Sequence, residues 1–342
     1  MTDNQQDQRN MVEIDRVNVV FGSHPEAALP LMDQGMERDA IKAETDQVLG
    51  VHDCSLNVRQ GEILVLMGLS GSGKSTLLRA INRLNPVCRG EVRIWDGSDM
   101  VSVTGASAAQ LRKLRLKNIS MVFQQFGLLP WRSVRENVGL GLELAGLPAA
   151  ERHQRVEAQL ETVGLSEWAD RKVGDLSGGM QQRVGLARAF ATEAPILLMD
   201  EPFSALDPLI RTRLQDELLE LQARMRRTII FVSHDLDEAF KLGNRIALME
   251  GGRIVQTGTA HDIIANPASP YVQQFVAHMN PLQVLRAADV AEPGSAEGAA
   301  LPRDLPLRDV LRDLSARPSA PVEGGGRVTR EGVLAALVAS RD

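Results

Sequence analysis

Apolar residues along this chain form two kinds of strand pattern. In residues 12–21 and 48–58 apolar and polar side chains alternate, which is typical of a β-strand. Other runs are almost wholly apolar, as expected for buried strands of a parallel sheet that is covered by helices. These runs lie within residues 62–67, 119–123, 194–202 and 228–235. The pattern predicts an α/β fold built on a parallel sheet.

Helical periodicity occupies the intervals between these strands. Apolar residues recur at helical spacing in several stretches, which places each set on one face of a helix, and we interpret the last set named below as core packing. The stripes are Leu77, Leu78, Ile81 and Leu84; Val156, Leu160 and Val163; and Leu214, Leu218, Leu221 and Met225. Residues 134–174 are rich in helical patterns, which predicts a helical subdomain attached to the α/β core. Short helices are also expected within residues 22–47, 307–314 and 330–338.

A glycine-rich loop directly follows the strand at residues 62–67 and opens a helix. Its sequence, GLSGSGKST, has the spacing Gly, four residues, Gly-Lys-Ser/Thr of phosphate-binding loops. Glycines let backbone N–H groups approach phosphate oxygens closely, and a helix N-terminus favours an anion. The lysine adds a charge at the β- and γ-phosphates, and the next serine is placed to ligate Mg²⁺. The predicted nucleotide-binding residues are Gly68, Ser70, Gly71, Ser72, Gly73, Lys74, Ser75 and Thr76.

Polar side chains stand at the exits of the other apolar strands, where ligands of parallel sheets bind. Asp200 is placed to anchor Mg²⁺ together with Ser75, and Glu201 to act as general base on the attacking water. Gln124 is a candidate ligand of Mg²⁺ or the water through its amide oxygen, and His234 a candidate donor to the γ-phosphate. For each of these residues, a solvated or purely structural side chain is the alternative.

A second anion-binding turn lies about a hundred residues after the first. In Leu-Ser-Gly-Gly at residues 176–179, glycine amides, the Ser177 hydroxyl and a helix N-terminus all suit a phosphate. The first loop already suffices for one nucleotide. Two phosphate sites in one chain therefore make sense if the second serves a partner subunit.

Composition narrows the class of protein. The 342 residues have room for about two domains, and the net charge of −6 provides no general attraction for nucleic acid. The sequence has no apolar run of roughly 18 residues that would span a membrane, and residues 1–10 are polar, which predicts a mobile tail instead of a signal peptide. Cys54 and Cys88 have no metal-ligand or redox spacing and are expected to be reduced structural residues.

Together, these motifs make the chain resemble the ATP-binding cassette (ABC) ATPases over about residues 11–280. The matching segments are GLSGSGKST at 68–76, Gln124, LSGGMQQR at 176–183, ILLMDEP at 196–202, SALD at 204–207 and His234, in the family's order. The resemblance implies a P-loop NTPase core of the RecA-like type. It further implies an antiparallel β subdomain, a helical subdomain inserted at about residues 126–180, and ATP and Mg²⁺ as cofactors.

The same resemblance implies a head-to-tail homodimer. Each ATP would lie between the phosphate loop of one copy and the signature turn of the other, and Asp207 would take part in communication across the interface. Phe21 matches the position of the aromatic residue that stacks on adenine, and a core phenylalanine is the alternative. The residues implied to reach the nucleotide from the partner copy are Ser177, Gly178, Gly179 and Gln181.

A narrower resemblance is to the ATPases of quaternary-amine importers, which take up choline, glycine betaine or proline betaine for osmoprotection. It rests on the insertion at residues 22–47, on MGLSGSGKST at 67–76 and on FGLLPW at 126–131. It implies that residues 126–131 face a separate membrane permease, with a packed surface aromatic as the alternative for Trp131. The chain would then lie on the cytoplasmic face of the cell membrane, and the permease would link it to an extracellular or periplasmic substrate-binding protein.

The tail from residue 281 to residue 342 departs from this family. Osmoregulatory members carry a pair of CBS modules at this place, whereas here only about sixty residues remain, and residues 326–334 resemble the end of one such module. The tail is thus a candidate remnant of a CBS-like module. Its shortness favours a choline-type importer over an osmotically gated one.

Other functions stay open at this point. An importer ATPase for another small solute, such as carnitine or an amino acid, would share the same cassette. A non-transport cassette ATPase acting on DNA or ribosomes usually carries two cassettes or a long coiled-coil insertion, and the sequence contains neither. A small-molecule kinase would leave the signature turn and His234 unexplained.

Overall fold

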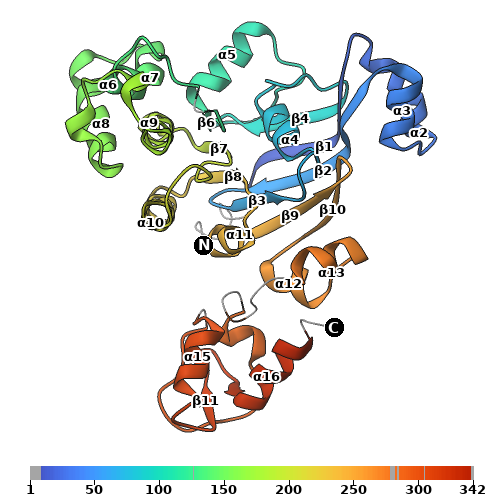
Figure 1. The fold of residues 1–342 in the computed structure, drawn as a ribbon, viewed down its shortest axis with the longest axis vertical. Coiled ribbons are helices and arrows are strands. Elements are labelled where there is room, and N and C mark those ends of the chain that lie inside the picture. Colours follow the sequence, from blue (N-terminus) through green and yellow to red (C-terminus); the bar gives the residue numbers. More distant parts are fainter. Residues whose placement is uncertain (1–8, 126, 278–281, 283–284, 304, 340–342) are drawn as a thin grey trace. The chain divides into compact units, whose positions relative to one another are not determined.

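The computed structural model describes residues 9–125, 127–277, 282, 285–303 and 305–339 (Figure 1). The chain divides into two compact units. The first comprises Met1–His234 and Met249–Ile254, and the second comprises Asp235–Leu248 and Val255–Asp342. The first unit contains every residue that the sequence predicts to bind or hydrolyse a nucleotide.

An antiparallel sheet forms one part of the first unit. Its strands are β1 (Asn10–Phe21), β2 (Val48–Arg59), β4 (Arg89–Trp95) and β5 (Met100–Ser102). They are arranged in the order β2-β1-β4-β5. Buried and exposed residues alternate in β2 from Cys54 onward, as the sequence pattern predicts. β1 ends at Phe21, which pairs with Val48 at the start of β2.

The insertion between β1 and β2 folds into short helices, which confirms the prediction for this segment. They are η1 (Pro25–Ala28), α2 (Leu29–Asp33) and α3 (Arg38–Thr45). The insertion and the adjoining strands enclose a small core of their own. Its buried residues are Val20, Ala28, Met32, Ile41 and Leu49.

The predicted parallel strands are confirmed and lie in a second sheet. They are β3 (Ile63–Met67), β6 (Ile119–Val122), β7 (Ile196–Asp200) and β8 (Thr228–Val232), and the sheet also contains β9 (Arg245–Glu250) and β10 (Arg253–Gly258). The order is β10-β9-β3-β8-β7-β6, and the neighbours among β3, β8, β7 and β6 are parallel. Val232 pairs with both Leu66 and Asp200. The phosphate loop and the polar exits of β7 and β8 therefore meet at one edge.

Two helices beside this sheet follow the predicted stripes except at their ends. α4 (Lys74–Ile81) buries the first three residues of its stripe, whereas Leu84 lies beyond the helix and is exposed. α10 (Pro208–Met225) buries Leu214 and Leu218, the side chain of Leu221 lies outside the described residues, and Met225 in the last turn is exposed. The core position predicted for Met225 and the helical position predicted for Leu84 are thus wrong, because a helix ends at or before each residue and the chain turns toward solvent.

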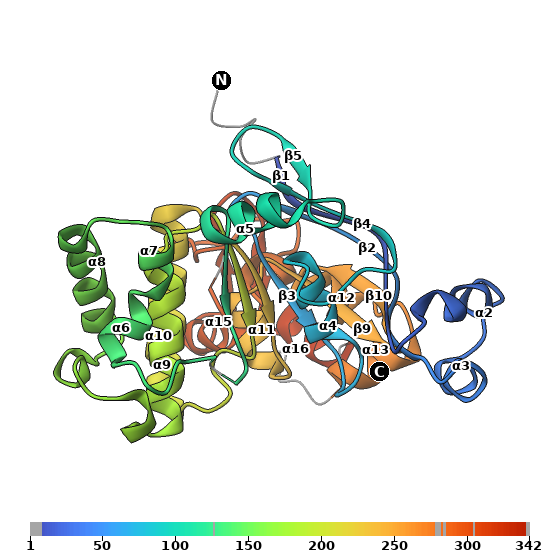
Figure 2. The same cartoon turned by 90° about the horizontal axis from the view of Figure 1, so that it is seen from above.

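Helices fill the segment between β6 and β7. They are α6 (Val134–Val138), α7 (Leu140–Leu144), α8 (Ala149–Thr162) and α9 (Gly178–Ala191), preceded by α5 (Ala108–Lys117) before β6. α9 packs against α6, α7 and α8. Figure 2 shows α6, α7 and α8 at the opposite end of the first unit from α2 and α3.

The second unit contains α11 (Leu236–Leu242) and the elements after β10. These are α12 (Ala260–Ala265), α13 (Pro270–Val276), η4 (Ala287–Val290), α15 (Leu307–Asp313), β11 (Ser319–Pro321), β12 (Arg327–Thr329) and α16 (Arg330–Ala339). α15 and α16 confirm the two helices expected in the tail. β11 and β12 pair antiparallel, and Leu301 forms a parallel bridge with Val322. Among the described residues, no helix has the length and apolar character needed to cross a membrane.

Candidate nucleotide-binding site

The phosphate loop folds as a backbone cradle. Gly68, Gly71 and Gly73 have positive φ angles of 142°, 78° and 99°, a region that other residues rarely adopt. A Cβ atom on Gly68 would lie 2.2 Å from the carbonyl oxygen of Met249, and one on Gly73 would lie 2.6 Å from that of Gly50. The glycines of the motif are therefore required for the shape of the loop itself.

Lys74 begins α4 with its side chain folded back into the loop. The residue is only 7% exposed, and its Nζ donates to the carbonyl oxygens of Gly68 at 2.8 Å and Leu69 at 2.9 Å. Burial lowers the pKa of Lys74, and the negative charges of Glu201 and Asp200 oppose this shift. The ammonium group is thus held at the centre of the cradle, where it would face a phosphate.

Asp200, at the end of β7, is fully buried and holds two partners. The Ser75 hydroxyl donates to its Oδ1 at 2.6 Å, and the Arg79 guanidinium donates from Nη2 to its Oδ2 at 2.8 Å. The structure thus brings together two of the predicted Mg²⁺ ligands. The contact of Arg79 with Asp200 was not predicted from the sequence. Arg79 lies one helical turn after Ser75, at the i, i+4 spacing that places both residues on one face of α4.

The oxygen atoms of Ser75 and Asp200 fit Mg²⁺. Adjacent ligands of an octahedral Mg²⁺ lie about 3 Å apart, because each metal–oxygen distance is about 2.0–2.1 Å. The described part of the chain has no cluster of three or more His, Cys, Asp or Glu residues that would hold a metal ion by itself. This sparse donor set suits Mg²⁺, which usually keeps several water ligands and shares phosphate oxygens.

The predicted catalytic residues meet at Glu201. Its Oε2 accepts a hydrogen bond from Gln124 Nε2 at 3.3 Å and lies 3.5 Å from His234 Nδ1. Glu201 has a positive φ of 48°, and its N–H donates to the carbonyl oxygen of Val232. Strained backbone of this kind is concentrated at functional sites. The three side chains reach one point from the exits of three different strands.

Gln182 supports this loop from α9 and was missed in the sequence. It is 1% exposed, its Nε2 donates to the carbonyl oxygen of Glu201 at 3.2 Å, and its Oε1 accepts from the N–H of Ala205 at 3.1 Å. The signature helix is therefore tied to the loop that carries the candidate base. The sequence indicates this residue only as the second glutamine of the LSGGMQQR segment.

The predicted residues of the phosphate loop and of the strand exits surround a cavity of about 550 Å³. Those on its wall are Phe21, Ser70, Gly71, Gly73, Lys74, Ser75, Thr76, Gln124, Glu201 and His234. Gly68 and Asp200 lie behind the wall, bonded to Lys74 and Ser75. Ser72 does not line the cavity, and its buried Oγ has no hydrogen-bond partner among the described residues.

Phe21 is placed for stacking at the mouth of this cavity. It is 39% exposed, so the alternative of a core phenylalanine is wrong. Gly50 makes room for the ring, because a Cβ atom there would lie 2.8 Å from Phe21 Cε2. The sequence reading missed this role of Gly50, and it also missed Arg38, which lines the same cavity.

The signature turn is formed but does not line the cavity of its own chain. Ser177 caps α9 by accepting from the N–H of Met180 at 3.4 Å, and Asp207 caps α10 by accepting from that of Ile210. Gln181 Nε2 donates to two backbone carbonyls of the preceding loop. In the described part of the chain, the cavity wall includes none of the five predicted partner-contacting residues. They are Ser177, Gly178, Gly179, Gln181 and Asp207. Their contact with a nucleotide in the partner copy stays a prediction.

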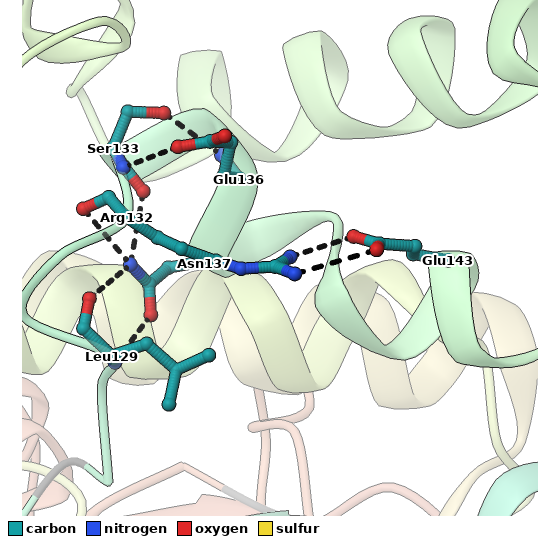
Figure 3. A network of polar contacts seen from close by, with 6 residues as sticks. All are labelled: Leu129, Arg132, Ser133, Glu136, Asn137 and Glu143. Carbon is teal, nitrogen blue, oxygen red and sulfur yellow. Dashed lines mark hydrogen bonds and ion pairs between the residues drawn. The ribbon is translucent and has the colours of Figure 1, made fainter.

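A buried asparagine organises the loop before α6 (Figure 3). Asn137 is fully buried; its Nδ2 donates to the carbonyl oxygens of Leu129 and Ser133, and its Oδ1 accepts from the N–H of Leu129 at 2.8 Å. Arg132 forms an ion pair with Glu143 at 2.6 Å. Asn137 therefore ties the end of the loop that carries the predicted permease contact to the start of α6.

A second cavity, of about 680 Å³, adjoins this loop and is called here the helical groove. Trp131, Arg132, Arg152 and Lys172 are among its lining residues. Trp131 is 68% exposed, so the alternative of a packed surface aromatic is wrong. Phe126, at the start of the predicted run, lies outside the described residues.

Comparison with known proteins agrees with this geometry. A family model described as ABC transporter matches residues 51–204. The chain is 50% identical over 280 residues to the glycine betaine/proline betaine transport system ATP-binding protein ProV of Escherichia coli K12, covering 82% of this chain and 69% of that protein. It is 41% identical over 326 residues to the trimethylamine N-oxide transport system ATP-binding protein TmoW of Ruegeria pomeroyi, covering 93% of this chain and 94% of TmoW.

Solved structures give the same result. The dimeric structure of the bacterial ABC transporter cassette MJ0796 matches with a TM-score of 0.63 and 31% identity, over 73% of this chain and 98% of that one. A second MJ0796 structure, bound to ADP and phosphate, matches equally well. The predicted fold, family and ATPase activity are confirmed. The chain belongs to the ABC transporter family, in which it is an ATP-binding and ATP-hydrolysing subunit.

Proposed function

We propose that this chain drives the import of a quaternary amine, glycine betaine or choline, as one of two identical ATPase subunits on the cytoplasmic face of a membrane permease. The supporting observation is the 50% identity to ProV, which extends over 280 residues, far beyond the short motifs that any cassette ATPase shares. The compact insertion between β1 and β2 is one of the segments on which the resemblance to the ATPases of quaternary-amine importers rests.

In the proposed hydrolysis step, Glu201 accepts the proton of the attacking water. Gln124 and His234 lie 3.3 Å and 3.5 Å from its Oε2 and orient this carboxylate and the water. Lys74 and the loop amides stabilise the charge of the β- and γ-phosphates. Ser75, Asp200 and Gln124 would hold Mg²⁺, which when bound neutralises part of the phosphate charge.

We propose that hydrolysis requires two copies of this chain. Ser177, Gly178 and Gly179 lie away from the cavity of their own chain, at the capped N-terminus of a helix that favours anions. In the dimer they would reach the γ-phosphate bound to the partner, with Gln181 behind them and Asp207 at the interface. The dimeric state of the MJ0796 cassette supports this arrangement.

The helical groove is proposed to receive a cytoplasmic segment of the permease. Trp131 offers a large exposed aromatic surface at this groove. Positive charges outnumber negative ones on the groove wall, which has four cationic side chains, Arg132, Arg135, Arg152 and Lys172, and two carboxylates, Glu136 and Glu143. Such a surface suits a short helix with an apolar face and acidic flanks. The permease would in turn connect the ATPase to the substrate-binding protein.

For the C-terminal part, we propose that the ATPase domain ends near residue 280 and that a small separate module follows. In this part of the chain, α15, β11 and β12 each contribute buried apolar residues, namely Leu307, Val310, Ala320 and Val328, and α16 contacts both α15 and β12. A CBS-like origin of this module stays a prediction.

A second candidate solute is trimethylamine N-oxide. The alignment with TmoW covers 94% of that protein and includes most of the tail, whereas the alignment with ProV covers 69% of ProV. Both solutes carry methyl groups on a tetrahedral nitrogen, so related binding proteins would recognise them.

The deciding experiment reconstitutes the ATPase with its co-encoded permease and binding protein in vesicles. Choline, glycine betaine, proline betaine, carnitine and trimethylamine N-oxide are then compared for stimulation of ATP hydrolysis. Stimulation by glycine betaine or choline is expected. Stimulation by trimethylamine N-oxide alone would replace the proposal with the second candidate, and stimulation by none of these solutes would overturn both.

A further inference from the structure

We infer that Arg38, delivered by the insertion between β1 and β2, contacts the phosphate chain of the bound nucleotide. Neither the motifs nor the comparisons point to this residue. It lines the nucleotide cavity together with Phe21, Lys74 and Glu201, although it belongs to α3.

The Arg38 side chain is fixed at the rim of the phosphate loop by two hydrogen bonds. Its Nε donates to the carbonyl oxygen of Leu49 at 2.6 Å, and its Nη1 donates to the carbonyl oxygen of Gly71 at 2.8 Å. A guanidinium has five N–H donors. Two of them make these bonds, so three donors remain for a ligand, because the described residues accept no further hydrogen bond from Arg38.

The backbone of Arg38 is also held in place. Three residues later on the same face of α3, Ile41 is fully buried in the core of the insertion, where it packs with Val20 and Met32. The Thr45 hydroxyl donates to the carbonyl oxygen of Ile41 near the helix end. A rigid helix therefore aims the guanidinium at the cavity before any ligand arrives.

The charge of Arg38 has no local counterpart. The buried carboxylate of Asp200 is matched by Arg79, and the charge of Lys74 faces Glu201 and Asp200. Arg38, by contrast, is bonded only to neutral carbonyl oxygens among the described residues, and it forms no ion pair with any of them. A polyanion in the same cavity is the natural partner of such a guanidinium, which binds phosphate oxygens with directed, charge-assisted hydrogen bonds.

The test compares nucleotides of increasing phosphate number on the full chain. Binding of adenosine, AMP and ADP is measured by calorimetry for the unaltered protein and for Arg38→Ala. We expect the affinity for ADP to fall about tenfold, the typical effect of losing a charge-assisted hydrogen bond, and that for adenosine to change less than twofold. Equal losses for adenosine and ADP, or no loss for either, would overturn the inference.

Two further variants separate the charge of Arg38 from its bonds to the loop. Arg38→Lys keeps the charge, whereas Arg38→Gln is neutral but keeps donors for the carbonyl oxygens. Recovery of ADP affinity by lysine and not by glutamine is expected, and the reverse result would show that Arg38 only shapes the loop. Lys42→Ala, an exposed residue of the same helix, is the matched control and should bind all three ligands normally. Thermal unfolding confirms that each variant is folded.

Discussion

The nucleotide cavity and the helical groove are similar in size, about 550 Å³ and 680 Å³, but they are built in different ways. Glycine, serine and threonine residues of the phosphate loop form much of the wall of the nucleotide cavity, and a Cβ atom at Gly50 or Gly73 would lie less than 3.0 Å from a neighbouring atom. The wall of the groove includes long side chains such as Arg132 and Arg135, which form ion pairs with Glu143 and Asp170.

This difference in construction fits a difference in ligand, because ATP is the same molecule in every relative whereas a partner protein varies. A backbone wall offers the same N–H groups whatever the sequence of a relative, which suits a ligand as invariant as ATP. A wall of long side chains is altered by single substitutions, which suits the permease contact proposed for this groove. Substitutions in the nucleotide cavity should therefore impair ATP binding or hydrolysis, whereas those in the groove should impair only coupling to a partner.

Replacing the candidate base should have the largest effect. Glu201→Gln is expected to bind ATP normally but to hydrolyse it about a thousandfold more slowly, because the amide cannot accept the proton of the water. Phosphate release measures the rate, and size-exclusion chromatography should show a dimer that accumulates with ATP. Hydrolysis at the normal rate would remove Glu201 from this role.

Removing the cation of the cradle should have the next largest effect. Lys74→Ala is expected to weaken ATP binding by roughly 10- to 100-fold, as expected for a lost charge-assisted contact. Equilibrium binding of a fluorescent ATP analogue measures this loss. Lys113→Ala, an exposed residue of α5, is the control and should bind normally. Unchanged affinity in Lys74→Ala would contradict the cradle described above.

In the helical groove, a substitution should leave the chemistry intact and affect only coupling. Trp131→Ala is expected to keep basal ATPase activity within about twofold but to lose most of the severalfold stimulation by permease and solute, because aromatic anchors dominate such contacts. Trp168 is also exposed but does not line the groove, so Trp168→Ala should keep its stimulation by permease and solute. If Trp131→Ala lost basal ATPase activity to the same extent as stimulation, the groove and the nucleotide cavity would not be independent.

Alkaline pH should weaken ATP binding by a smaller amount. Burial lowers the pKa of Lys74, so this ammonium loses its proton at a lower pH than an exposed lysine does. The neutral amine attracts phosphate less, and affinity should therefore fall as the pH rises through this lowered pKa. Titrations of ADP binding at several pH values test this, and Lys74→Arg should remove the decline. A flat profile in the unaltered chain would contradict it.

The site residues that could be predicted are those that directly follow a recognisable strand in the sequence. The phosphate loop, Asp200, Glu201 and His234 lie next to apolar strands, and parallel strands necessarily end at one edge. Gln182 and Arg38 could not be identified in this way, because their partners lie 19 and 33 residues away in sequence, across different elements. Their contacts depend on how α9 and α3 pack, which no local pattern specifies.

The strands of the tail escaped prediction for a different reason. β11 and β12 have three residues each, too few for an alternating pattern to become visible. The tail helices were long enough to predict. For Leu84 and Met225 the helical spacing was correct, but the helix end was not marked by a proline or glycine at that position.

The positive φ of Glu201 has a consequence for how this protein tolerates change. A left-handed backbone costs a residue with a side chain about 1 kcal/mol, and glycine is spared most of this cost. The greater conformational entropy that glycine loses on folding is of similar size and opposes this gain. Glu201→Gly should therefore lose its base at little cost in stability. Selection for heat resistance or expression alone would not retain the carboxylate, so its presence depends on selection for ATP hydrolysis.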